Sequence, residues 1–201
     1  MKTETKRMVY FAAGLALGGV ATVPLHEFGH GIVDYLQGGN PSFSINELGN
    51  AQTNATSYNS GNLGKELNVT AGGPLANYVS GVGLAAISKK VKNQYTREFL
   101  AGASLSQAIA PFAQALTEFG AHYLNYRATV DGGDFDFISS HTGIPYALII
   151  PATGLALIGI NKYLQSSDGR NTENKNKPET DEKNQSFAEK IYQKIAKRAK
   201  R

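Results

Sequence analysis

The fold is decided by residues 8–30, which read MVYFAAGLALGGVATVPLHEFGH. The first eighteen of these residues, Met8 to Leu25, contain no charged side chain and follow a short basic N-terminal segment. This length and composition predict a membrane-spanning helix. The run continues into His26 without the small-residue exit site of a cleaved signal peptide, so we expect the helix to be retained.

Three further apolar segments follow, at residues 69–88, 99–119 and 144–160. Each is rich in Gly, Ala and Ser, which lets helices approach closely inside a bilayer. Together with residues 8–25, they predict an all-α membrane protein with about four transmembrane helices; a soluble bundle of buried helices is the alternative. Basic residues precede the first span, separate the second from the third, and follow the fourth. The positive-inside rule therefore predicts a multi-pass protein with both termini in the cytoplasm.

Charge separates a body from a tail. Residues 165–201 hold 10 of the 20 Lys and Arg and 6 of the 16 Asp and Glu, so the tail supplies the whole net charge of +4. We expect a membrane-embedded domain over 1–164 and a disordered linker with a basic end over 165–201. Residues 186–201 fit either an amphipathic helix on the lipid bilayer or a solvated tail. The body lacks a basic, aromatic platform, so we expect no nucleic-acid partner.

A polar stretch, residues 37–68, separates the first two predicted spans. Its fragments FSI (43–45) and ATSY (55–58) predict a small β-hairpin inserted after the first helix.

The chemistry of the chain centres on HEFGH at residues 26–30. On a helix, His26 and His30 share one face, so both imidazoles can bind one metal ion, and Glu27 lies beside it as a general base. The chain has no Cys, so any further ligand must be a His or a carboxylate. Two His and a Glu in an apolar span are costly unless they bind something, which favours a functional site.

A catalytic zinc site usually takes three protein ligands, so the motif needs a third. The candidates are Asp131 and Asp134, in TVDGGDFDFI before the last apolar segment, and Glu118 and His122, one helical turn apart at the end of the third. The alternative for either Asp is a structural one, a loop turn or a helix cap.

Three motifs together resemble the site-2 protease family of intramembrane zinc metalloproteases, the M50-like peptidases. They are HEFGH at 26–30, AGGPLAN at 71–77 and VDGGDF at 130–135. The resemblance implies that the two His residues of the first motif and a downstream Asp bind Zn²⁺, and that Glu27 is the catalytic base. It further implies that Asn77, with Gly73 and Pro74, lies against the site and positions substrate or polarises its scissile carbonyl.

The chain departs from the family pattern around the third ligand. The prolines that usually flank the family's Asp are missing from NYRATVDGG, and the apolar segment 99–119 intervenes before the acidic motif. Asp131 matches the family's Asp-Gly-Gly, whereas Asp134 resembles the acidic segment of divergent members. We prefer Asp134 and keep Asp131 as the alternative.

The resemblance implies a zinc-dependent endopeptidase that hydrolyses peptide bonds of membrane protein or peptide substrates at or just inside the bilayer. The positions of the basic residues place all three motifs on the same, non-cytoplasmic side of the membrane. The alternatives are a catalytically inactive metal-binding or structural membrane protein of the same fold, and a soluble HExxH peptidase.

Overall fold

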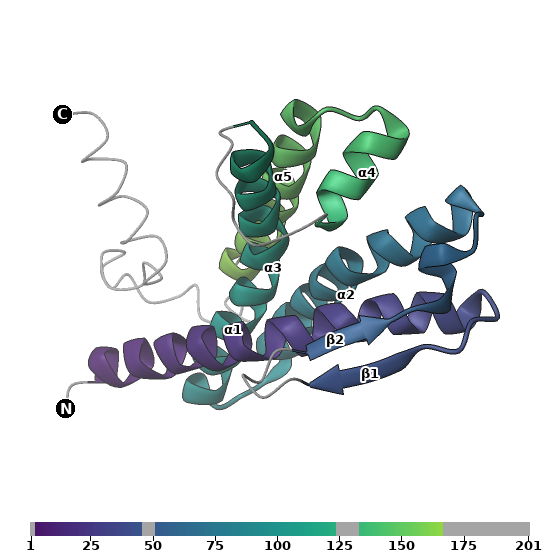
Figure 1. The fold of residues 1–201 in the computed structure, drawn as a ribbon. Coiled ribbons are helices and arrows are strands. Elements are labelled where there is room, and N and C mark those ends of the chain that lie inside the picture. Colours follow the sequence, from purple (N-terminus) through teal and green to yellow (C-terminus); the bar gives the residue numbers. More distant parts are fainter. Residues whose placement is uncertain (1–2, 46–50, 124–132, 167–201) are drawn as a thin grey trace.

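A computed structural model describes residues 3–45, 51–123 and 133–166 and shows a mostly helical chain (Figure 1). The described helices are α1 (Thr3–Leu36), α2 (Leu63–Lys90), α3 (Gln94–Tyr123), α4 (Asp134–Thr142) and α5 (Tyr146–Gln165). Between α1 and α2 lie β1 (Ser42–Ile45), β2 (Ala51–Asn54) and the short 3-10 helix η1 (Thr56–Asn59). A mostly helical fold with a hairpin after the first helix is thus confirmed. The predicted tail lies outside the described residues beyond Ser166.

Three of the described helices, α1, α3 and α5, are long and apolar enough to cross a membrane. They contain or overlap the predicted spans 8–25, 99–119 and 144–160. The remaining predicted span, 69–88, forms part of α2, which is not among these three helices, so the described helices support three of the four predicted spans. The reason lies in polar residues: α2 buries Thr70 and Asn77 where an ordinary span would carry apolar side chains.

Small residues let α1 lie directly against its neighbours. A Cβ atom on Gly102 of α3 would lie 2.1 Å from the carbonyl oxygen of Phe11, and one on Gly29 would lie 2.3 Å from the carbonyl oxygen of Gly72 in α2. The backbone of α1 therefore touches α3 along its first half and α2 along its second. This is the close packing that the Gly-rich composition predicts.

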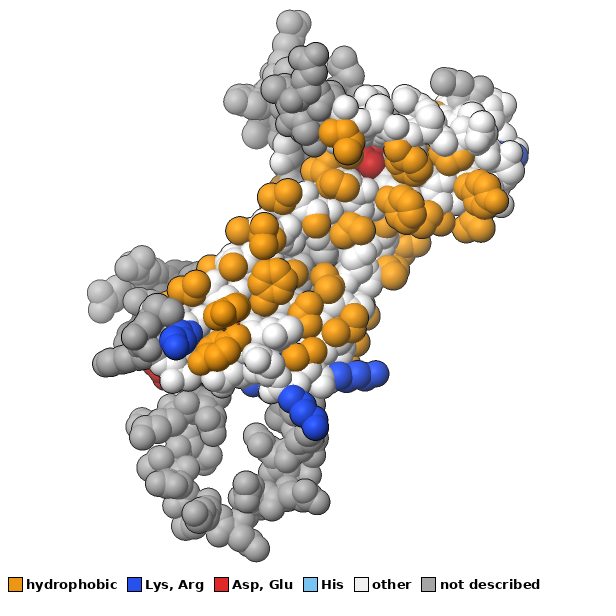
Figure 2. All heavy atoms as spheres, turned by 90° about the horizontal axis from the view of Figure 1, so that it is seen from below, with side chains coloured by type: hydrophobic (Ala, Val, Ile, Leu, Met, Phe, Trp, Pro, Cys, Tyr) orange, Lys and Arg blue, Asp and Glu red, His pale blue; other side chains and the backbone are white. Residues whose placement is uncertain are grey.

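Basic segments distant in the sequence meet at one end of the molecule. The Arg7 Nε atom donates to Oε1 of Glu98 at 2.9 Å, which joins the start of α1 to the start of α3. Lys89 Nζ, at the end of α2, donates to the Ser166 carbonyl at 3.2 Å, just after α5. Figure 2 shows a largely hydrophobic face with most of its visible Lys and Arg side chains near one end. The arrangement agrees with the positive-inside rule, while the orientation in a membrane stays a prediction.

The first strand of the hairpin contains the predicted segment FSI, but the second strand is not the predicted segment ATSY. β1 pairs antiparallel with β2, with Phe43 opposite Thr53. The predicted strand ATSY instead enters η1. The cause is the buried carboxylate of Asp34, which accepts hydrogen bonds from the backbone N–H groups of Thr56 and Ser57 at 3.0 and 2.9 Å. Those N–H groups are then no longer free to continue the ladder, and the chain turns.

Helices α3, α4 and α5 share a small apolar core. Its buried members come from all three helices: Ala115, Phe135, Tyr146 and Ile149. The segment leading to the last predicted span is therefore a separate short helix, α4, which packs against α2, α3 and α5. This docking places Asp134, the first residue of α4, on the side that faces α1.

Candidate metal centre

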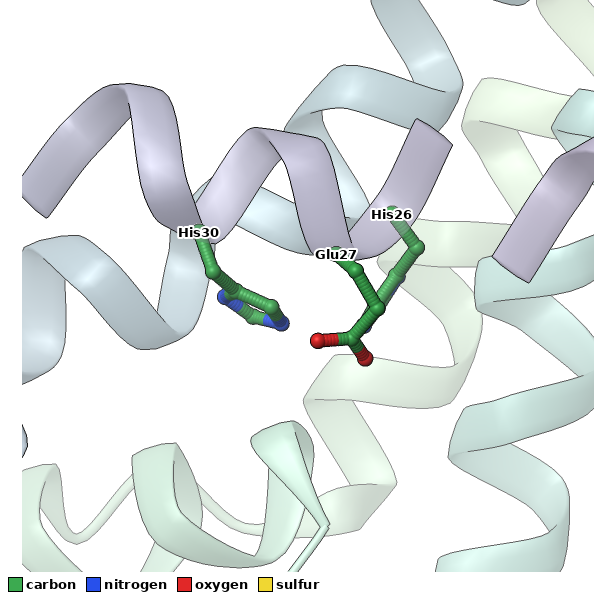
Figure 3. Close-up of side chains that lie close together, drawn as sticks. All are labelled: His26, Glu27 and His30. Atoms are coloured by element: carbon green, nitrogen blue, oxygen red, sulfur yellow. The ribbon is translucent and has the colours of Figure 1, made fainter. Parts of the chain in front are cut away.

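The HExxH residues lie in the second half of α1. Figure 3 shows His26, Glu27 and His30 extending from the same side of the helix into one space. One ligand atom of each lies within 4.8 Å of the others, and the group could hold a metal ion. These side chains line a cavity of about 410 Å³, and His30 is only 3% exposed.

The structure brings Asp134 to both imidazoles. Its Oδ2 atom lies 2.7 Å from His26 Nε2, and its Oδ1 atom lies 3.5 Å from His30 Nε2. Ligand atoms of a tetrahedral zinc site lie roughly 3.3 Å apart, because each is about 2.0–2.1 Å from the metal. The 2.7 Å separation is that of a direct ion pair and the 3.5 Å separation is close to the ligand spacing, so the Asp134 carboxylate lies within reach of an ion held by the two imidazoles.

The charge of Asp134 also suits a metal ligand. Burial by itself raises the pKa of this carboxyl, but hydrogen bonds and charge interactions with His26 and His30 outweigh burial. The pKa of Asp134 consequently lies well below its ordinary value, and the group is a carboxylate at neutral pH.

Two of the other candidate ligands, Glu118 and His122, contact α4 instead of the imidazoles. Asp131 lies outside the described residues. Glu118 accepts a hydrogen bond from the backbone N–H of Asp136 at 2.8 Å, and His122 Nδ1 lies 3.1 Å from Asp136 Oδ1. Both therefore contact the first turn of α4 rather than His26 or His30.

Strand β2 holds the predicted general base. The backbone N–H of Thr53 donates to Oε2 of Glu27 at 2.7 Å, and the Thr53 hydroxyl donates to the Glu27 carbonyl at 2.5 Å. Glu27 is thus fixed by one carboxylate oxygen in the wall of the cavity. Sequence reasoning missed Thr53, because its role depends on how the hairpin docks on α1 and no motif marks it.

Contacts behind the imidazoles orient their metal-facing atoms. His30 Nδ1 lies 2.7 Å from the carbonyl oxygen of Val69, which accepts its hydrogen and leaves Nε2 free as a ligand. On the other side, the Asn77 amide nitrogen lies 3.3 Å from His26 Nδ1. The Asn77 Oδ1 atom is buried and has no hydrogen-bond partner among the described residues. Turning the amide over would let Oδ1 accept the hydrogen of Nδ1.

Asn77 therefore contacts the back of His26 and does not line the cavity with Glu27. The resemblance implies that this residue positions substrate or polarises its scissile carbonyl, and that role stays a prediction. The position found here suits a residue that orients a ligand.

Gly73 leaves the room that the two imidazoles occupy. A Cβ atom at this position would lie 2.5 Å from His30 Nε2 and 2.6 Å from His26 Nε2. The two Nε2 nitrogens thus occupy the space beside the backbone of α2 that any side chain at this position would fill. The AGGPLAN motif contributes this space, with the buried Pro74 next to it.

Sequence reasoning also missed two residues of the site region, Asp34 and Tyr58. Asp34 lies four residues after His30, on the same face of an apolar helix, and this spacing is a signal that could have identified it.

Tyr58 lines the cavity. Burial, and then the negative charges of Asp134, Glu27 and Asp34, raise the pKa of its phenol well above the ordinary value. The phenol therefore stays a neutral hydrogen-bond donor. No sequence signal marks it.

Comparison with protein-family models, with curated proteins and with solved structures finds no match to this chain.

Proposed function

We propose that this chain is a zinc-dependent endopeptidase of the site-2 protease type, which hydrolyses peptide bonds of membrane-associated protein or peptide substrates. One observation carries the proposal. The carboxylate of Asp134 lies against the Nε2 atoms of both His26 and His30, although more than a hundred residues separate it from them. Two imidazoles and a carboxylate are the kind of ligand set that catalytic zinc sites use, with three protein ligands and one open position.

Six residues that line the cavity have a role in this proposal: His26, Glu27, His30, Thr53, Tyr58 and Asp134. Zinc bound by the two His and Asp134 would polarise the scissile carbonyl and lower the pKa of water. Glu27 accepts the proton of the attacking water and passes it to the leaving amine. The Thr53 N–H keeps the carboxylate in place for both transfers. Tyr58 donates a hydrogen bond to the oxygen on which negative charge develops.

The membrane setting supports a membrane-associated substrate. The catalytic motif lies within α1, one of the three helices apolar enough to cross a bilayer. A substrate that reaches the cavity therefore approaches along a membrane surface or within it. We place both termini on the cytoplasmic side, with α2 as a further crossing between α1 and α3. The Arg7–Glu98 contact joins the starts of α1 and α3, and the Lys89–Ser166 contact joins the ends of α2 and α5, which supports this arrangement.

The proposal is tested by a metal analysis of the purified full chain paired with the variant Glu27→Gln. We expect about one zinc per chain in both proteins and at least a roughly thousandfold loss of cleavage in the variant, measured on quenched fluorescent transmembrane peptides. Glu66→Gln is the matched control, because Glu66 lies outside the cavity and accepts from the Gly61 N–H at 3.1 Å.

Wild-type protein without metal at His26 and His30 would overturn the proposal, as would a Glu27→Gln variant that cleaves normally. Zinc binding without any cleavage by the wild type would favour the inactive metal-binding protein instead.

A further inference from the structure

The third ligand is held by helix α3 through its side chain. Gln114 Nε2 donates to Oδ2 of Asp134 at 3.1 Å. The same Oδ2 atom lies 2.7 Å from His26 Nε2. A donor on this oxygen fixes the rotation of the carboxylate, and therefore fixes which oxygen faces which imidazole.

The backbone around the third ligand is held by α3 as well. Helix α4 begins at Asp134, and Gly133 at its N-cap position has no side chain to cap the helix. Glu118, one helical turn beyond Gln114, caps the helix instead, because its Oε2 atom accepts from the Asp136 N–H at 2.8 Å. A carboxylate at this position satisfies a free N–H group and interacts favourably with the helix dipole.

The absence of a side chain at Gly133 leaves room for the Glu118 carboxylate. A Cβ atom on Gly133 would lie 2.1 Å from Glu118 Oε1, so a side chain here would displace the carboxylate. Glu118 itself is only 6% exposed. A buried glutamate from a neighbouring helix therefore replaces the local cap and sets the start of α4 against α3.

From these contacts we propose that Gln114 and Glu118 are positioning residues, which hold Asp134 in the geometry that binds the metal. The inference rests on the proposed zinc site and concerns metal affinity rather than cleavage. Neither residue is a proposed ligand. Gln114 contacts the Asp134 carboxylate and Glu118 contacts the first turn of the helix that begins at Asp134, so both act through Asp134. The segment 99–119, which departs from the family pattern, thus supplies the support for the third ligand.

The experiment measures Zn²⁺ affinity of the full chain in detergent by competition with a chelating dye, and the absorption spectrum of the Co²⁺-substituted protein. We expect Gln114→Leu to weaken Zn²⁺ binding about 10–100-fold, as outer-shell changes do. We expect Glu118→Leu to weaken it at least as much, and Glu118→Gln, which keeps an acceptor for the Asp136 N–H, to restore most of the affinity. Altered Co²⁺ bands should accompany the loss.

Thr117→Val is the matched control, because Thr117 lies on the same helix and its hydroxyl donates to the Ala113 carbonyl on an exposed face. Wild-type affinity and an unchanged Co²⁺ spectrum in Gln114→Leu would overturn the inference, whether or not Glu118→Leu folds. Full affinity in folded Glu118→Leu would overturn the role of Glu118 directly.

The outcomes separate this inference from the proposed function. Wild-type protein that binds Zn²⁺ but cleaves nothing would refute the peptidase, while the affinity series would still decide the role of α3. Wild-type protein that binds no Zn²⁺ would refute both.

Discussion

Both halves of α1 pack closely against a neighbouring helix through glycine residues, but only the second half contributes to the candidate site. In the first half, Gly102 of α3 brings its backbone against Phe11, and the buried Gln107 donates to the Gly18 carbonyl at 2.7 Å. In the second half, Gly29 meets Gly72 just as closely. Close contact between helices is therefore a property of the whole helix, and it does not by itself make a site.

The halves differ in the polar side chains that the close contact encloses. The second half buries His30 and Asp34, and it adds His26 and Glu27 at the cavity. Small residues therefore set the distance between helices, while a few polar groups on one face of α1 decide the chemistry. Substitutions at the second half should therefore reduce zinc binding and cleavage, whereas substitutions at the first half should reduce stability.

The largest effect is expected from Gly73→Ala. The added Cβ would lie 2.5–2.6 Å from the Nε2 atoms of His30 and His26, so both imidazoles must move. We expect zinc binding and cleavage to be lost. Metal content and peptide cleavage are the measurements.

Gly83→Ala is the control for that variant, since a Cβ on Gly83 of the same helix meets nothing within 4 Å. It should leave both zinc and activity unchanged. Normal zinc content in Gly73→Ala would contradict the arrangement of the imidazoles around α2.

Tyr58→Phe should lower kcat about 10–100-fold and leave zinc content unchanged, because it removes one hydrogen-bond donor from the cavity. Tyr78→Phe is the matched control: its hydroxyl donates to the Thr153 carbonyl at 3.3 Å, outside the cavity. Equal kcat in wild type and Tyr58→Phe would remove Tyr58 from the mechanism.

Asp34→Asn should lower activity about tenfold with zinc retained. The carboxylate accepts from the N–H groups of both Thr56 and Ser57, and hydrogen bonds to a charged group are worth about 1.5–3 kcal/mol each. Weakening them should loosen η1, which carries Tyr58. Faster proteolytic cleavage within residues 51–62 would report the loosening. An unchanged cleavage rate there would show that the charge of Asp34 is dispensable for η1.

The smallest effect on catalysis is expected from the first half of α1. Gly102→Ala should destabilise the protein by about 1–3 kcal/mol, because its Cβ overlaps the Phe11 carbonyl. A lower unfolding temperature in detergent is the measurement, with cleavage per bound zinc unchanged in the folded protein. Gly19→Ala is the control, since its Cβ meets nothing within 4 Å. Loss of zinc in folded Gly102→Ala would remove the distinction between the halves.

The parts that the sequence predicts well are those determined by local spacing. The i, i+4 spacing of His26 and His30 places both imidazoles on one face of any helix, and the structure has that helix. The hairpin is predicted from the strand-forming residues around Phe43, which are also a local signal. A short motif favours Asp134, and the structure places this residue at the two imidazoles.

The parts that could not be predicted depend on tertiary contacts. Residues 55–58 have strand propensity, but the carboxylate of Asp34 takes the N–H groups that a strand would use. The length of 69–88 predicts a span, but α2 buries Thr70 and Asn77. Gln114 and Glu118 become visible only once α3 and α4 lie side by side.

Residues 53–57 are attached to α1 at two points, so the length of this segment must match the length of helix between those points. It is fastened at Glu27 through the Thr53 N–H and at Asp34 through the N–H groups of Thr56 and Ser57. Seven helical residues cover about 10.5 Å, and three extended residues cover about 10 Å, so the two lengths match. Substituting the exposed Asn54 should be harmless, whereas inserting a single residue beside it would release one carboxylate or the other.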